Sequence, residues 1–366
     1  MRSAPGPRNS ITDVAGVLVG HHQVLDNDVT LGTGAATGCT VVRVPGGATA
    51  AVDVRGGGPG TRETDLLDPA NTVRQLNAVL LTGGSAYGLA AADGVMRWSE
   101  EHGEGIPMDP ADPSRVVPIV PAAVIFDLPV GAWHIRPDAD FGFLAAEAAA
   151  ADFARGTAGA GVGARAGALK GGIGSASVVL ADGPGAGVTV GAVIVANPVG
   201  SVVDPRTGLL WGAGTDGPDF FGLRPGTAAE IAALDALPVK GTVLNTTIGV
   251  VATDAALDPV ACHRLATTAH DGLARAIRPV HSPLDGDTLF ALSTAAIEVP
   301  PIPLPGAFPG DLLLLDQLCT AAAVVVERAV VDAVLSATSI AGIPAYRDLF
   351  PRRLPAGGDR GARGAE

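Results

Sequence analysis

Cysteine and lysine are both scarce in this chain. Its 366 residues include only three cysteines, Cys39, Cys262 and Cys319, which lie far apart and form no CxxC pair. An odd number of widely spaced cysteines argues against a disulfide framework and against a structural zinc site. Only two of the 24 lysine and arginine residues are lysines, Lys170 and Lys240.

A basic surface and a long uncharged apolar run are also missing. The net charge is −13 and no basic run is present, which excludes the usual footprint for nucleic acid. The longest apolar stretch, residues 312–335, is interrupted by Asp316, Glu327, Arg328 and Asp332. A membrane span needs about 20 nearly uncharged residues, so this stretch predicts a buried helix. Because the first residues lack an apolar signal segment, we expect a cytoplasmic protein without membrane or nucleic-acid partners.

Apolar residues and glycine are abundant instead. Hydrophobic residues make up 47% of the chain, which is enough for a large core and excludes global disorder. The 50 glycines and 29 prolines predict many tight turns and close backbone approaches. We expect residues 1–10 to form a flexible arm, residues 11–350 a single domain and residues 352–366 a disordered tail.

Short β-rich runs alternate with alanine-rich stretches along the chain. Runs that are apolar throughout, such as residues 188–196, are typical of strands buried on both faces. The pattern predicts an α/β protein with helices layered over sheet. Strands are expected at residues 16–20, 39–44, 49–55, 78–82, 122–127, 175–180, 188–196, 246–253 and 288–293. Helices are expected at residues 85–102, 141–154, 228–236, 259–277 and 311–336, the fourth starting with Asp258 as its N-cap and Pro259 in its first turn.

One strand–turn–helix segment carries a hydroxyl group at its turn. Residues 77–95 run from an apolar strand through Gly83-Gly84 into a helix that begins near Ser85. A nucleophile elbow would have glycine two residues after the serine, and Tyr87 stands there instead. Helix capping by Ser85 is the simpler interpretation, and a hydrolase based on Ser85 is the weakest alternative.

No metal-binding pattern is present in the sequence. It contains no HExxH motif and no EF-hand loop, and its seven histidines are mostly scattered. His134 and His281 lie in loop-like segments, where a surface position is expected. Because the members of a Ser-His-Asp triad need not be sequence neighbours, spacing leaves such a triad open. We expect neither a metal ion nor an organic cofactor.

Two segments, each at the start of a predicted strand, carry residues suited to catalysis. Thr246 follows Asn245 at the first strand, and Asp285 and Asp287 precede the second. A threonine hydroxyl is a poor nucleophile, but cleavage before Thr246 would place a free α-amine beside it. Such an amine, with a pKa of about 7.7–8, can act as its base. Nearby carboxylates could orient that amine and share protons. From these residue types alone, a structural threonine at the start of a strand is the simpler interpretation.

In these segments and several others the chain resembles peptidase family S58. This family includes L-aminopeptidase/D-esterases, β-aminopeptidases and nylon-oligomer endo-hydrolases. The resemblance extends from residue 9 to the last predicted helix and is specific because many segments match in the same order. The matching segments are residues 9–22, 36–65, 81–89, 162–177, 197–200, 245–255 and 285–294.

The resemblance implies an αββα sandwich similar in outline to N-terminal-nucleophile hydrolases, a fold that ornithine acetyltransferase shares. It also implies a precursor that cleaves itself once, here between Asn245 and Thr246, with both pieces remaining together. Family members suggest a homo-oligomer, a tetramer of processed units. The substrate would be a small amide or peptide.

The resemblance also assigns roles to individual residues. Thr246 would attack the scissile carbonyl with its own α-amine as base, while Asp285 and Asp287 hold and polarise this nucleophile. Asn197 matches a side chain of the oxyanion hole. Lys170 matches a lysine near the site. Tyr87 matches a tyrosine that contacts the substrate.

One departure from the aminopeptidase branch bears on the substrate. That branch usually has serine as nucleophile and Ser-x-Glu downstream, whereas this chain has Thr246 and Asp285-Gly286-Asp287. The latter is the pattern of the nylon-oligomer hydrolases and favours amides of ω-amino acid oligomers. The alternatives are an aminopeptidase acting on L-, D- or β-aminoacyl amides, an acyl transferase similar to ornithine acetyltransferase, and a non-catalytic binding protein.

Overall fold

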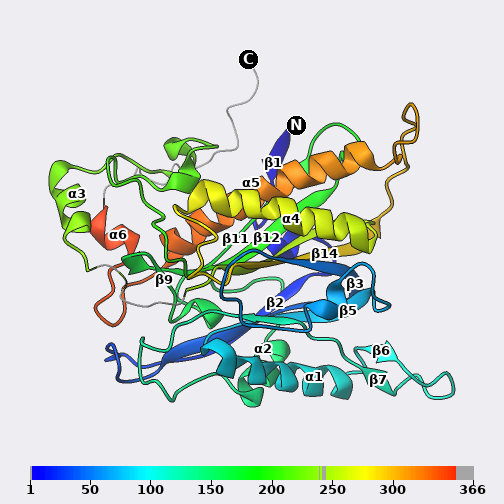
Figure 1. Ribbon diagram of the computed structural model, residues 1–366, viewed down its shortest axis with the longest axis horizontal. Coiled ribbons are helices and arrows are strands. Elements are labelled where there is room, and N and C mark those ends of the chain that lie inside the picture. Colours follow the sequence, from blue (N-terminus) through cyan, green and yellow to red (C-terminus); the bar gives the residue numbers. More distant parts are fainter. Residues whose placement is uncertain (1, 239, 241–244, 352–366) are drawn as a thin grey trace.

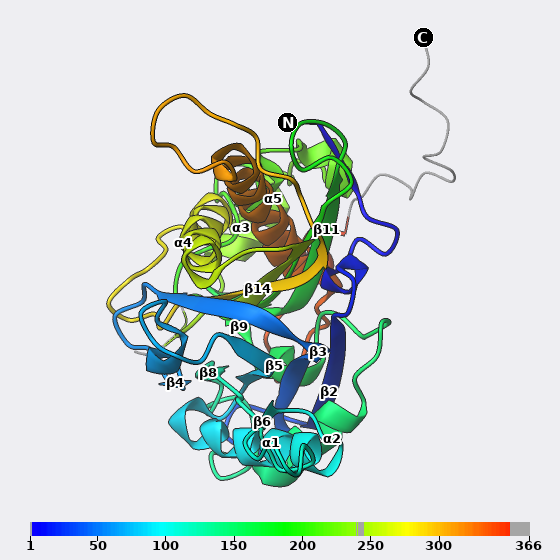
Figure 2. The same cartoon turned by 90° about the vertical axis from the view of Figure 1, so that its right-hand side faces the viewer.

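The structure is a computed structural model that describes residues 2–238, 240 and 245–351. The tail predicted at residues 352–366 lies outside these ranges. Within them, the chain forms four layers in the order helices, sheet, sheet, helices (Figure 1). One outer layer contains α4 (Pro259–Ala276) and α5 (Leu312–Ser336), and the other contains α1 (Ala91–Glu101) and α2 (Ala139–Glu147). This is the αββα sandwich that the resemblance implied, and Figure 2 shows the same order from the side.

Ten hydrogen-bonded strands form the two inner layers. Their order is β1-β11-β12-β13-β14-β3-β5-β8-β4, and β2 pairs with β3 beside this path. Only the β13–β14 and β5–β8 pairs are parallel, the rest being antiparallel. The strands are β1 (Ser3–Pro5), β2 (Leu18–Leu25), β3 (Ala36–Val54), β4 (Thr61–Arg62), β5 (Gln75–Thr82), β8 (Ala122–Val124), β11 (Gly172–Leu180), β12 (Thr189–Ala196), β13 (Ile248–Ala255) and β14 (Thr288–Ile297).

The long strand β3 connects the two sheet layers. Residues 36–43 pair with β2, whereas residues 49–54 pair with β14. The register against β5 shifts between Arg43 and Ala48. Gly47, with φ +77°, lies in this interval, where a side chain would be strained. The sequence predicted two strands here, and the structure merges them into one bent strand.

Side chains of the inner strands alternate between two cores. Ile194 on β12 belongs to the core under α4 and α5, together with Leu265 and Val326. Its neighbour Val193 belongs to the core between the two sheets, together with Phe290. Because β12 is buried on both faces, its sequence is apolar at almost every position. A third core, including Trp98, lies under α1 and α2.

Two of the predicted helices differ from the observed ones in extent. Residues 85–102 form a 3-10 helix, Ser85–Ala90, followed by α1. The helix predicted at 141–154 is α2, which ends at Glu147. α4 starts as predicted, with the Asp258 side chain accepting a hydrogen bond from Ala261 N at 2.7 Å. The remaining α-helices are α3 (Ala228–Asp235) and α6 (Tyr346–Leu349).

The N-terminal residues are ordered rather than a free arm. Residues 3–5 form β1, which pairs antiparallel with β11 at the edge of the sheet. Ser10 is buried and caps a 3-10 turn at Ile11–Asp13. Backbone pairing to an existing sheet edge, which local composition does not reveal, accounts for this difference.

Candidate active site

The parallel pairing of β13 and β14 brings the two catalytic segments together. Ile248 lies opposite Thr288, so the residues before each strand meet at the same end of the sheet. Asn245 and Asp285 form an isolated parallel bridge there. Asn245 N donates to Leu284 O at 2.9 Å, and Gly286 N donates to Asn245 O at 3.0 Å. The peptide before Thr246 is thus held against the acidic segment.

Thr246 is buried with its hydroxyl against the peptide that precedes it. Its Oγ1 donates a hydrogen bond to the carbonyl oxygen of Asn245. Its amide N donates to the carbonyl oxygen of Asn197 at 3.2 Å. These two contacts fix both groups of Thr246 that the predicted chemistry uses.

Gly286 leaves the space that the Thr246 hydroxyl occupies. A Cβ at residue 286 would lie 2.9 Å from Thr246 Oγ1 and 2.6 Å from the carbonyl oxygen of Gly58. Gly58 belongs to the glycine run at residues 56–58, whose backbone also donates to Asp285 O. The glycine-rich sequence therefore serves the close approach of three chain segments around the hydroxyl.

The two carboxylates have different surroundings. Asp285 Oδ1 accepts a hydrogen bond from Val199 N at 3.0 Å, while its buried Oδ2 has no partner among the described residues. Burial, and then the charge of Asp287, raises the pKa of Asp285 to about 6. Asp287 Oδ1 accepts from Thr247 N at 2.7 Å. Its Oδ2 accepts from His281, through the backbone N at 3.1 Å and the ring Nδ1 at 2.8 Å.

A surface position was expected for His281, but its ring and backbone N are hydrogen-bonded to Asp287. Its ring stacks edge to face with that of His270 in α4, with 4.8 Å between the centroids. His281 Nε2 and His270 Nδ1 are buried and have no partner among the described residues. A contact of this kind has no sequence signal, because the loop conformation that turns the ring inward is not readable from composition.

Asn197 directly follows β12, and both polar atoms of its side chain are hydrogen-bonded. Its Oδ1 accepts from Arg165 N at 2.9 Å, and its Nδ2 lies 3.4 Å from Phe126 O. Lys240 also reaches this residue, which the sequence did not indicate. Lys240 Nζ donates to Asn197 Oδ1 at 2.9 Å, to Asn197 O at 3.2 Å and to Arg165 O at 2.8 Å.

Lys170 is fully buried close to this group, but its hydrogen bonds go to backbone. Its Nζ donates to the carbonyl oxygens of Gly161 at 2.9 Å and Gly171 at 2.8 Å. Burial lowers the pKa of Lys170 to about 7, and burial raises the pKa of Asp127 to about 6. Each charge favours the other, and both act on Lys240. Lys170 therefore contributes to the electrostatics of the site without a bond to Thr246 among the described contacts.

Ser85 and Tyr87 lie on the 3-10 helix after β5. The backbone N of Ser85, at φ +53°, donates to Ile125 O at 3.0 Å, so residue 85 does not start a regular α-helix. Tyr87 is 57% exposed, and Arg136 stacks on its ring at 3.9 Å. Tyr87 is therefore available to a ligand, whereas none of its contacts reaches Thr246 among the described residues.

The described part of the chain lacks two further features, a metal-ligand cluster and a helix that could cross a membrane. There, no group of three or more His, Cys, Asp or Glu side chains is placed to hold a metal ion. No helix within the same residues is both long enough and apolar enough to cross a bilayer.

Comparison with known proteins identifies the class of this fold and site. The fold is similar to that of the L-aminopeptidase D-Ala-esterase/amidase of Ochrobactrum anthropi, with a TM-score of 0.65 at 24% identity. The match covers 92% of this chain and 88% of that one. That protein is described as a variant of the N-terminal-nucleophile hydrolase fold. The chain therefore shares this variant of the N-terminal-nucleophile hydrolase fold.

The sequence comparisons agree with the structural one. A Mycobacterium tuberculosis protein described as an uncharacterized aminopeptidase is 60% identical over 348 residues, 94% of this chain and 98% of the relative. The 6-aminohexanoate-oligomer endohydrolase of Paenarthrobacter ureafaciens is 32% identical over 349 residues, 91% of each chain. The model of Peptidase family S58 matches residues 9–347. The chain belongs to this family and is an amide or peptide hydrolase.

Proposed function

We propose that this protein is a self-processing amide hydrolase with Thr246 as its N-terminal nucleophile, and that it cleaves amides of ω-amino acid oligomers. The observation that carries the proposal is the contact between Thr246 Oγ1 and the carbonyl oxygen of Asn245. The hydroxyl lies against the one peptide bond whose cleavage would give Thr246 a free amine.

Self-cleavage would proceed in two steps. Thr246 Oγ attacks the carbonyl carbon of Asn245, the C–N bond breaks, and the nitrogen takes the proton that Oγ gives up, which leaves an ester. Water then opens the ester, giving the Asn245 carboxylate and the Thr246 α-amine. The bond from Gly286 N to Asn245 O, at 3.0 Å, supplies a donor to the carbonyl oxygen on which charge develops.

The processed enzyme would use the same hydroxyl on a substrate amide. The α-amine of Thr246 takes the Oγ proton, Oγ attacks the substrate carbonyl, and the leaving amine receives that proton. Water then hydrolyses the acyl-threonine ester. Asp285, whose Oδ2 has no partner among the described residues, is the carboxylate available to the new α-ammonium. Asn197 Nδ2, whose contact with Phe126 O is long at 3.4 Å, would donate to the oxyanion.

The other predicted site residues would support this chemistry without taking part in bond making. Asp287 holds the backbone N of Thr247 and so the start of β13. Lys170, fully buried, would bias charge in the site, and exposed Tyr87 would contact the substrate. No metal ion or organic cofactor enters any step. The enzyme would work as a cytoplasmic homo-oligomer of processed units.

Two relatives favour different substrates. The Thr246 and Asp285-Gly286-Asp287 pattern and the 32% identical 6-aminohexanoate-oligomer endohydrolase favour ω-amino acid oligomers. The 60% identical relative is described as an aminopeptidase, which supports the alternative of L-, D- or β-aminoacyl amides. Acyl transfer, as in ornithine acetyltransferase, would differ in passing the acyl group to an amine rather than to water.

The test of processing is the intact mass of fresh wild-type protein beside Thr246→Ala. We expect two wild-type fragments, with Thr246 as the new N-terminus, whose masses sum to that of the chain plus one water. The variant should remain whole. Wild-type protein that stays whole under every condition would overturn the proposal, because Thr246 would then have no free amine.

The test of substrate class compares soluble nylon-6 oligomers with aminoacyl p-nitroanilides. Release of shorter 6-aminohexanoate oligomers by wild type, and its loss in Thr246→Ala, would support ω-amino substrates. Activity on the p-nitroanilides alone would move the assignment to an aminopeptidase.

A further inference from the structure

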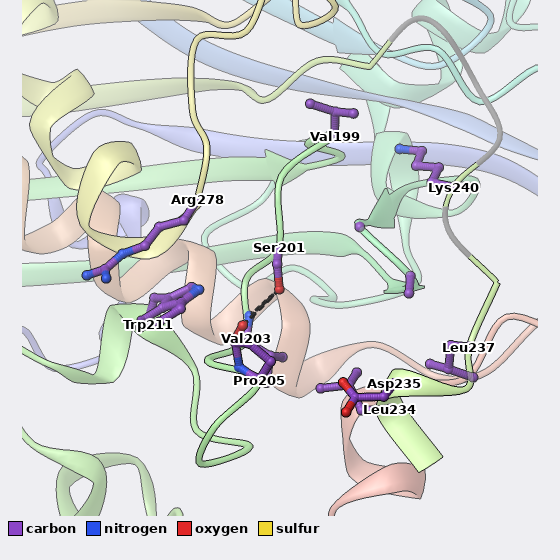
Figure 3. Close-up of a pocket in the computed structure, with 12 residues that line it drawn as sticks. Val199, Ser201, Val203, Pro205, Trp211, Leu234, Asp235, Leu237, Lys240 and Arg278 are labelled. Atoms are coloured by element: carbon purple, nitrogen blue, oxygen red, sulfur yellow. Dashed lines mark hydrogen bonds between the residues drawn. The ribbon is translucent and has the colours of Figure 1, made fainter. Parts of the chain in front are cut away.

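Lys240, whose Nζ donates to Asn197 Oδ1, lines a cavity of about 480 Å³. In Figure 3, Lys240 and Val199 lie on one side of this cavity, and Trp211 with Arg278 on the other. Its lining is predominantly apolar, including Val203, Leu234 and Leu237. Two of its lining residues contact the candidate catalytic group: Val199 N donates to Asp285 Oδ1 at 3.0 Å, and Lys240 Nζ donates to Asn197 Oδ1 at 2.9 Å.

At one end of the cavity, the side chain of Lys240 makes the hydrogen bonds that a bound alkylamine would make. The residue is 7% exposed, and its Nζ has three oxygen acceptors within 3.2 Å, which matches the three donors of an ammonium group. All three acceptors belong to Asn197 and Arg165, whose positions are set by β12 and by the Arg165 N bond to Asn197 Oδ1. The acceptors therefore do not depend on the chain segment that carries Lys240.

We propose that this cavity is the leaving-amine subsite of the processed enzyme, that it takes a primary amine on an unbranched alkyl chain, and that Lys240 Nζ occupies its three acceptors before cleavage. The proposal rests on the proposed function. It adds the chemical form of the group that departs and the pocket that accepts it. Lys240 resembles this group chemically, since its side chain is an unbranched aminobutyl chain.

We assign the cavity to the leaving amine, rather than to the acyl group, because Lys240 and Thr246 donate to the same oxygen atom. Lys240 Nζ and Thr246 N both donate to the carbonyl oxygen of Asn197, each at 3.2 Å. In amide cleavage, the departing nitrogen takes its proton from the Thr246 α-ammonium and so must lie beside it. A nitrogen at the Lys240 Nζ position meets this requirement, and its alkyl chain then extends into the apolar cavity.

Cleavage itself would release the internal occupant. Once Thr246 has an α-ammonium on Asn197 O, a second ammonium on the same oxygen is opposed by like-charge repulsion. Burial and the Arg165 charge already lower the pKa of Lys240 well below its usual value, so the charged form of its amine is disfavoured there. The three acceptors are then open to the amine of a substrate.

A binding experiment tests the subsite without any turnover. In Thr246→Ala/Lys240→Ala the chain stays whole and the Cγ–Nζ atoms of Lys240 are absent, so n-propylamine should replace them. We expect n-propylamine to bind this double variant at least about tenfold more tightly than it binds Thr246→Ala, and more tightly than n-propanol or tert-butylamine, by calorimetry. Equal binding by both variants, or equal binding of the alcohol, would overturn the proposal.

A second experiment uses the processed wild-type enzyme. An amine in the subsite should intercept the acyl enzyme: its nitrogen attacks the ester carbonyl, the bond to Thr246 Oγ breaks, and Oγ regains a proton. Formation of the n-hexylamide should saturate with n-hexylamine. In Leu234→Trp, which narrows the cavity, half-saturation should need at least about tenfold more amine. Leu144→Trp on α2, at a position 45% exposed, is the matched control that should leave half-saturation unchanged.

The outcomes separate the two proposals. Amide formation that rises linearly with amine concentration, or an equal half-saturation in Leu234→Trp, would overturn the subsite while leaving the hydrolase intact. Absence of self-cleavage in wild type would overturn the proposed function, and the n-propylamine experiment would still report on the subsite.

Discussion

The Nδ1 atom of His281 lies 2.8 Å from Oδ2 of Asp287, and the backbone N of the same histidine lies 3.1 Å from that oxygen. The other oxygen of Asp287 accepts from Thr247 N at 2.7 Å. His281 therefore holds the carboxylate that accepts from Thr247, the residue after Thr246. In the mechanism proposed above, His281 would be a positioning residue that acts through Asp287.

Replacing His281 tests this relationship. Hydrogen bonds to a charged group are worth about 1.5–3 kcal/mol, so His281→Ala should slow self-cleavage by about 10–100-fold. His281→Asn, whose Nδ2 can donate where Nδ1 did, should recover most of the rate. Mass spectrometry of pulse-labelled precursor measures both. An alanine variant that processes at the wild-type rate would remove His281 from the mechanism.

Gly286→Ala should block the nucleophile without unfolding the protein. The added Cβ would lie 2.9 Å from Thr246 Oγ1 and 2.6 Å from Gly58 O, which forces the hydroxyl or the loop to move. A misplacement of about 1 Å can cost about 100-fold in rate, and we expect that loss in self-cleavage. Gly46→Ala is the control, since nothing lies within 4 Å of a Cβ there. Normal processing by Gly286→Ala would show that this approach is not required.

Asn197→Asp should separate oxyanion stabilisation from packing. The aspartate retains Oδ1 as acceptor for Arg165 N but loses the Nδ2 donor. Loss of one oxyanion donor costs about 10²–10³ in kcat. We expect this loss per processed molecule, counted by titration of the acylated nucleophile, with a smaller change in KM. A kcat close to that of wild type would assign the oxyanion contact to another donor.

Self-cleavage should depend on the protonation of Asp285. Because the pKa of Asp285 is raised to about 6, we expect the processing rate to fall as pH falls through about 6, where the carboxylate becomes neutral. Asp285→Asn should remove this acidic limb and process slowly at every pH. An unchanged limb in Asp285→Asn would assign it to another group.

The raised pKa of Asp285 also predicts how the stability of the fold depends on pH. Low pH should slow processing but should stabilise the fold. A carboxyl group whose pKa is higher in the folded than in the unfolded chain stabilises the fold at low pH, and this contribution is lost as pH rises through about 6. In the uncleaved Thr246→Ala background, Asp285→Asn should therefore raise the Tm at pH 8 more than at pH 4. Thermal unfolding at the two pH values measures the difference.

Much of the framework could be predicted from local patterns. Apolar runs such as that of β12 indicated strands buried on both faces, and Asp258 with Pro259 marked the start of α4. The two-layer bend of β3 was not predicted, because a strand that changes sheet at Gly47 has the same alternation as two separate strands. β1 was missed because its partner, β11, is distant in sequence.

The sequence by itself determined the chemical groups: a threonine after asparagine, two aspartates around a glycine, and the order of segments that places the chain in peptidase family S58. Only the tertiary structure decided that His281 lies on Asp287 and that Lys240 lies on Asn197. Local patterns record hydrophobicity and backbone preference. These contacts depend instead on where loops from separate strands end, a position set by packing over the whole sheet.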